Sequence, residues 1–169
     1  MASMFAGLSP GNEPDPSFIM NYMMIFPIIM ILLLAVHYGW FWAVGVGLQH
    51  KLPPEVTMKV GRFKIFLLIP VVYILCIVGF VASTMSNVFQ NGTPPDFEIV
   101  WIIAFIVPLH FFCMFCIFYG MYFVAKTFKS AELQREVILS DYEGEFFLIW
   151  FFPIGIWFIQ PKINEMIEE

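Results

Sequence analysis

Charged side chains are scarce in this chain, at 12% of its residues, whereas about a quarter is usual in a soluble domain. Hydrophobic residues make up 60% of the sequence. The net charge of −5 lies largely in the two tails and in the acid-rich stretch before the last apolar run, so the chain lacks the basic surface that a nucleic-acid partner requires. Few soluble folds could bury this much apolar surface, and the composition therefore predicts a protein embedded in a lipid bilayer.

The sequence also lacks the signatures of familiar enzymes. It contains no G-x-S-x-G, H-E-x-x-H, P-loop or dinucleotide-binding glycine motif. Its three cysteines lie inside apolar runs, so they do not indicate a disulfide framework in the loops. Once the apolar runs are subtracted, no room remains for a separate soluble catalytic domain. The sequence thus favours a protein that is not an enzyme and that holds no cofactor, without deciding either point.

Four apolar runs are present, where roughly 20 apolar residues are needed to cross the hydrocarbon layer. The predicted spans cover about residues 18–48, 63–88, 98–125 and 141–160 of a single multi-pass domain, residues 1–169. The apolar part of the fourth, 146–159, is short and is either a full crossing or a re-entrant segment. Ser140 and Glu143 have the spacing of a capping box, which favours a helix that begins there and crosses. The predicted fold class is an all-α integral membrane protein, a bundle of four transmembrane helices.

Lysine and arginine are distributed unevenly between the predicted loops. Residues 49–64 and 126–140 hold seven of the eight basic side chains, and the eighth is Lys162. Cytoplasmic loops carry the excess of basic residues, so both loops are predicted to be cytoplasmic, in a plasma or inner membrane. A re-entrant fourth segment would bring Lys162 to the same side. The charge pattern therefore favours the re-entrant alternative, which the capping residues oppose.

A stripe of small residues recurs every fourth position in the first predicted span, at Ala35, Gly39, Ala43 and Gly47. Small side chains let helices approach closely in lipid, where van der Waals contact drives association. The stripe either packs against another helix of the same chain or forms an interface with a partner or a second copy. Under either version, leucine at Gly39 is expected to do more damage than leucine at Gly45, which lies off the stripe.

Two histidines within the predicted spans, His37 and His110, are the weak candidates for a functional or cofactor-binding site, because ionisable groups inside a membrane are rarely incidental. His110 is predicted near the bilayer centre and His37 in an aromatic belt at the edge, and this difference in depth argues against one haem held by both. Cys113 and Cys116 lie near His110 in sequence, but Cys116 is rotated about 120° from it on a helix. We therefore predict no metal site, and a hydrogen bond from His110 to a neighbouring helix unless it carries protons or ligand.

The third loop is the longest polar stretch and mixes both signs of charge. One interpretation is a docking surface for a cytoplasmic partner, formed by Glu132, Gln134, Arg135 and Glu136. The other is a solvated extension of the preceding helix, in which Glu132 and Arg135 pair at helical spacing.

The leading functional prediction is a non-enzymatic accessory or assembly subunit of a membrane complex. Its partners would be the lipid bilayer and other membrane subunits or further copies of itself, with no nucleic acid. The first alternative is a small oligomeric transporter or channel with His110 on its path. The second is a redox subunit that binds haem or quinone.

Overall fold

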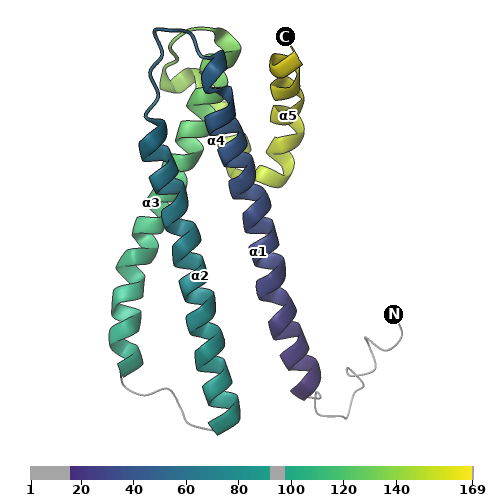
Figure 1. Ribbon diagram of the computed structural model, residues 1–169, viewed down its shortest axis with the longest axis vertical. Coiled ribbons are helices and arrows are strands. Elements are labelled where there is room, and N and C mark those ends of the chain that lie inside the picture. Colours follow the sequence, from purple (N-terminus) through teal and green to yellow (C-terminus); the bar gives the residue numbers. More distant parts are fainter. Residues whose placement is uncertain (1–15, 92–97, 169) are drawn as a thin grey trace, which may run out of the picture. The chain divides into compact units, whose positions relative to one another are not determined.

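The computed structural model describes residues 16–91 and 98–168. In chain order they form α1 (Pro16–Gly47), the short 3₁₀ helix η3 (Leu48–Lys51), α2 (Val60–Asn91), α3 (Glu98–Leu133), α4 (Leu139–Trp150) and α5 (Phe152–Glu168), shown in Figure 1. These residues contain no strand, so the predicted all-α class is confirmed for them. The chain divides into two compact units, Met1–Val36 and His37–Glu169. The described part of the first unit is the beginning of α1, an apolar helix that contains Pro27.

Three helical stretches of the described chain are long and apolar enough to cross a membrane, namely Ile25–Lys51, Val60–Val88 and Ala104–Leu133. The fourth predicted span differs from expectation. The single helix expected over 141–160 is wrong, because the chain forms two helices there, α4 with 12 residues and α5 with 17. Each is shorter than the roughly 20 residues that a crossing requires. The four-helix bundle is therefore not confirmed.

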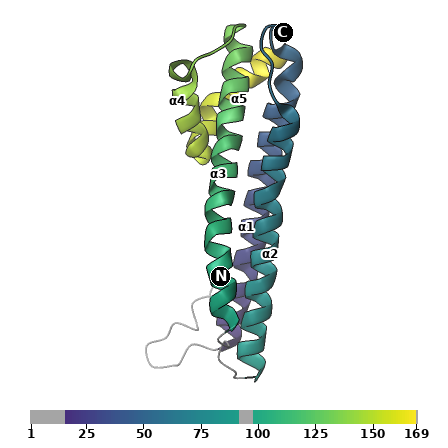
Figure 2. The ribbon, with the colours of Figure 1, turned by 90° about the vertical axis from the view of Figure 1, so that its left-hand side faces the viewer.

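Within the second unit, α2 and α3 lie side by side and antiparallel (Figure 2). Near the start of α2, the ring of Phe63 stacks on that of Phe123 with centroids 4.2 Å apart. Further along α2, Tyr73 lies beside His110, which comes earlier in α3. A later residue of α2 thus contacts an earlier residue of α3, which is the pattern of two antiparallel helices.

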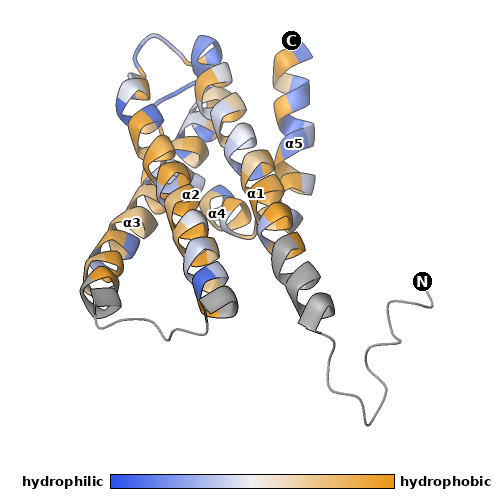
Figure 3. Ribbon diagram, turned by 60° about the horizontal axis from the view of Figure 1, so that its bottom comes forward, coloured by the Kyte–Doolittle hydropathy of each residue, from blue (hydrophilic) through white to orange (hydrophobic). Residues whose placement is uncertain are grey.

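The buried core of the second unit lies at one end, around η3 and the connection between α3 and α4. Among the described side chains, none of α2 beyond Pro70 and none of α3 before Cys113 is buried. Figure 3 shows that the exposed lengths of α2 and α3 are predominantly hydrophobic. The core cluster consists of Phe41, Val44, Leu48, Phe63, Leu67, Met121, Phe123, Val124, Ala125, Phe128, Val137, Tyr142, Ile149, Ile159 and Ile163.

Candidate functional site

The last two helices form a hairpin whose reversal depends on a glycine. The backbone leaves helical geometry at Phe151, with φ −90° and ψ 51°, and Pro153 follows in the first turn of α5, where proline is tolerated. A Cβ added at Gly155 would fall on the carbonyl oxygen of Leu148 and lie 2.9 Å from its Cα. Only a residue without a side chain therefore allows the start of α5 to approach the end of α4 so closely.

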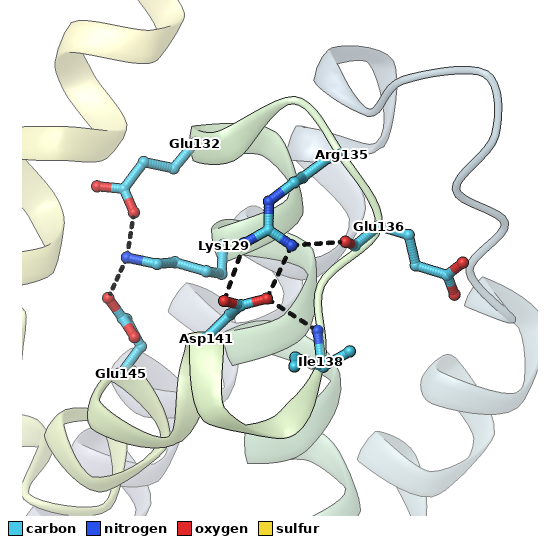
Figure 4. A network of polar contacts seen from close by, with 7 residues as sticks. All are labelled: Lys129, Glu132, Arg135, Glu136, Ile138, Asp141 and Glu145. Atoms are coloured by element: carbon cyan, nitrogen blue, oxygen red, sulfur yellow. Dashed lines mark hydrogen bonds and ion pairs between the residues drawn. The ribbon is translucent and has the colours of Figure 1, made fainter.

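A network of ion pairs fixes this hairpin to α3. The ammonium group of Lys129 donates to Glu132 at 2.7 Å and to Glu145 of α4 at 2.8 Å (Figure 4). Glu132 also accepts a hydrogen bond from Lys162 of α5 at 2.9 Å. The side chains of Lys129 and Glu145 are only 17% and 13% exposed, so these charges are screened less than pairs in open solvent. Lys162 consequently lies at the same end of the second unit as the third loop.

A second pair of charges shapes the turn that leads into α4. Arg135 binds the Asp141 carboxylate through two hydrogen bonds of 2.9 and 3.0 Å. Asp141 also accepts a hydrogen bond from the backbone N–H of Ile138 at 3.0 Å, which satisfies a free donor at the helix start. The hydrogen bonds from Arg135, and to a smaller extent the one from Ile138, lower the pKa of the Asp141 carboxyl. Because α4 begins at Leu139 with Ile138 as its N-cap, the predicted capping box of Ser140 and Glu143 is wrong.

Gln134 ties the third loop to the first loop. Its backbone φ is 50°, a left-handed conformation that is uncommon for residues other than glycine. The side-chain amide donates to the carbonyl oxygens of Lys51, at 2.9 Å, and Ala131, at 2.7 Å. The ends of η3 and α3 are thereby joined at one end of the unit.

The predicted docking residues are thus mostly engaged within the chain. Glu132, Gln134 and Arg135 all hydrogen-bond to other residues of the described structure. Glu136 has a side chain that is 72% exposed and lies 3.9 Å from Lys126. A role of this loop in docking stays a prediction, and the structure shows that its residues also hold together the helices around it.

The two histidines lie in different surroundings. Nδ1 of His110 is 3.3 Å from the hydroxyl of Tyr73 on α2, a hydrogen bond of the kind predicted for it, and His110 itself is exposed. His37 is half-buried, and its ring lies 4.4 Å from those of Phe41 and Phe152. The ring contacts and hydrogen bond described for the two imidazoles share no residue, so this geometry offers no support for one group held by both.

No arrangement suited to a metal ion is present in the described residues, since no three His, Cys, Asp or Glu side chains gather there. Cys113 and Cys116 are buried, whereas His110 on the same helix is exposed. The exposed His110 therefore does not share the buried surroundings of the two cysteines.

The small-residue stripe is exposed, and the close helix contact lies elsewhere. A Cβ added at Gly39 or Gly47 would meet no atom within 4 Å, and Ala43 is exposed. Ala35, in the first unit, is also exposed. By contrast, a Cβ at Gly45 would lie 2.7 Å from the Phe63 ring. For folding of the chain alone, this geometry favours the opposite order of the two leucine substitutions, and an interface between the stripe and a partner stays a prediction.

The sequence analysis missed the structural roles of three residues. Gly155 and Gly45 sit at close contacts that depend on which helix faces them, although the Pro-Ile-Gly run at 153–155 within an apolar segment is a signal for a break. The third is Gln160, whose side-chain oxygen accepts a hydrogen bond of 2.7 Å from the Trp40 indole. Trp40 and Gln160 are 120 positions apart in the sequence, and no local pattern joins them.

Comparison with known proteins identifies no relative: no family model, no curated protein and no solved structure matches this chain.

Proposed function

We propose that the chain is a membrane protein with three helices across the bilayer and a C-terminal hairpin, α4–α5, that enters and leaves on one side. The three long apolar helices support the crossings. The ion pair between Lys162 and Glu132 supports the return of α5 to the end at which α3 finishes.

The orientation rests on the basic residues. The bond from Gln134 to Lys51 joins the first and third loops at one end, and Lys162 lies there too. All eight lysines and arginines then fall on one side, in keeping with the excess of basic residues in cytoplasmic loops. We therefore infer that residues 49–64, 126–140 and the C-terminus are cytoplasmic, in a plasma or inner membrane.

Within this membrane the proposed role is that of a non-enzymatic accessory or assembly subunit. The observation that carries it is the pair of His110, which is exposed, and Tyr73, which is half-buried, on the α2–α3 surface outside the core cluster. Polar groups in hydrocarbon are costly and normally face other protein segments or water. A helix of another protein packed over His110 would remove its imidazole from lipid and supply further hydrogen-bond partners.

The test is cross-linking from the membrane-facing surface. A photoreactive residue replaces Val107, which lies one turn from His110 and is 48% exposed, and in a matched control it replaces Phe105, which is 72% exposed and points about 140° away from His110. We expect an adduct of discrete mass from Val107 and none from Phe105. Lipid adducts alone at both positions would contradict the accessory role.

The same experiment distinguishes the accessory subunit from the first alternative, a small oligomeric transporter or channel. If the adduct has the mass of two copies of this chain, the exposed histidine faces its symmetry mate, which favours the small oligomeric transporter or channel. A titrating His110 at such an interface would make flux in proteoliposomes depend on pH, and His110→Gln would abolish that dependence because glutamine does not titrate near neutral pH.

A further inference from the structure

An apolar groove of about 250 Å³ opens on the second unit between α1 and α2. Its walls are Tyr38, Gly39 and Trp42 of α1 and four residues of α2 between Lys64 and Val71. Apart from Lys64 at one end, the α2 wall is made of leucine and valine side chains. A Cβ at Gly39 would meet no atom within 4 Å, so the groove widens where α1 carries no side chain.

The groove has a polar end and an apolar end. The Lys64 ammonium lies 4.9 Å from the centre of the Trp42 ring, at the end nearest the first loop. From there the groove follows α2 to Val71, seven residues or ~10 Å along a helix axis. Within the described structure no carboxylate pairs with Lys64, because none of the ion pairs includes it. Its charge is therefore available to an anion at the membrane surface.

The lining favours an apolar occupant with one charged end. An extended hydrocarbon chain would cover the apolar wall from Leu67 to Val71 along its length. Trp42 is a side chain of the type that concentrates at the level of lipid headgroups.

We propose that this groove binds an anionic phospholipid, with one acyl chain along α2 and the phosphate beside the Lys64 ammonium. Basic pockets between membrane helices on the cytoplasmic side are suited to anionic headgroups. Arg62 and Lys59, at the same end of α2, add to the positive potential there. Lys64 selects for charge, and Gly39 leaves room for the chain.

The proposal is tested by native mass spectrometry of the full-length protein in detergent, with equal amounts of dioleoyl phosphatidylglycerol and dioleoyl phosphatidylcholine added. We expect wild type to retain phosphatidylglycerol about fivefold better, since one lysine near a membrane surface contributes roughly 1 kcal/mol toward an anionic lipid. Lys64→Gln should remove that preference, whereas Lys59→Gln, a loss of charge away from the groove wall, should keep most of it.

A second pair of variants tests the groove itself. Gly39→Leu places a side chain in the lipid's path, and its Cβ meets no other atom of the protein within 4 Å, so retention of phosphatidylglycerol should be largely lost while thermal stability changes little. Gly79→Leu is the matched control, because it also has no atom within 4 Å but lies outside the groove. Equal retention of both lipids by wild type, equal losses from Lys64→Gln and Lys59→Gln, or full retention by Gly39→Leu would each overturn the proposal.

Discussion

The two halves of the α2–α3 pair differ sharply in how much of their surface the chain itself covers. At the loop end, Phe63 and Phe123 are 0% and 1% exposed and belong to a continuous core with η3, α4 and α5. In the far half, side chains such as Val72 and Phe111 are 50% and 70% exposed. Only 11% of the apolar window of α2 and 22% of that of α3 is buried. The loop end can therefore hold its own structure, whereas the far half depends on what surrounds it.

This contrast has a physical cause. Lipid chains are as apolar as the side chains of the far half, so no hydrophobic gain drives those helices together. At the loop end, the packed core of η3, α3, α4 and α5 and the partly buried ion pairs of Lys129 provide contacts that do not depend on lipid. Substitutions at the loop end should consequently change stability in detergent much more than comparable substitutions in the far half.

The largest effect is expected at Gly155. Gly155→Ala places a methyl group on the backbone of Leu148, which cannot move aside as a flexible side chain could, and should lower the free energy of unfolding by about 3 kcal/mol or open the hairpin. The measurement is thermal unfolding in detergent together with labelling of a cysteine at Glu168 by an impermeant thiol reagent. In wild type that cysteine should react from the same side as one at Glu55.

The control for this substitution lies on the preceding helix. Gly144 has no atom within 4 Å of an added Cβ, and alanine is the better helix former, so Gly144→Ala should be neutral or stabilising by about 0.5 kcal/mol. If the two alanine variants unfold at the same temperature and label alike, the close approach of α4 and α5 is not needed for the fold.

A somewhat smaller effect is expected at Gly45. Gly45→Leu forces its side chain against Phe63, which is already stacked on Phe123, and overpacking of this kind costs about 2 kcal/mol. Gly39→Leu, on the exposed stripe, should change the unfolding temperature little. The comparison is made by thermal unfolding of both variants, and a larger loss from Gly39→Leu would restore the stripe as a packing seam within the chain.

These glycines show what the sequence alone could and could not predict. Composition and the lengths of the apolar runs were sufficient for the all-α class and for the first three long helices, because these depend on local hydrophobicity. The residue type alone does not distinguish Gly39 and Gly47, which are exposed, from Gly45, which lies against Phe63. Which glycine lies under Phe63 depends on the rotation of α1 relative to α2, and that is set by contacts between distant segments.

The last segment shows a second limit. Its capping residues favoured a crossing, while the position of Lys162 favoured a return to the side of the third loop. The structure shows Lys162 paired with Glu132, at the end where α3 finishes. The capping argument failed because the first turn of α4 is capped by Asp141, which accepts hydrogen bonds from Arg135 and from the backbone N–H of Ile138. This arrangement depends on the conformation of the turn before α4. For His110, the hydrogen bond to a neighbouring helix was predicted, but its partner, Tyr73, was not.

The next effect in size concerns the ion pairs at the loop end. Lys129→Ala leaves the partly buried carboxylates of Glu132 and Glu145 without their shared cation, and it should cost about 1.5 kcal/mol, less than the loss of a fully buried pair. Lys126→Ala, which removes a lysine 3.9 Å from the exposed Glu136, should cost about 0.3 kcal/mol. Thermal unfolding at low and high salt checks both, and equal losses would mean that the network contributes no more than a surface pair.

The smallest effect is expected at Asp141, and this effect should depend on pH. Because Arg135 and the Ile138 N–H lower the pKa of the Asp141 carboxyl below its ordinary value of 3.8, the ionised carboxylate stabilises the fold above that pH. This contribution is lost as the pH falls through the lowered pKa of the folded state. Asp141→Asn should therefore unfold at a lower temperature than wild type at pH 7, and the difference should shrink progressively below about pH 4.

The control is Glu143→Gln, which removes a neighbouring exposed carboxylate for which the described structure shows no ion pair. It should leave the dependence of the unfolding temperature on pH as in wild type. A difference between Asp141→Asn and wild type that stays constant down to strongly acidic pH would mean that the cap stabilises α4 through its shape and not through its charge.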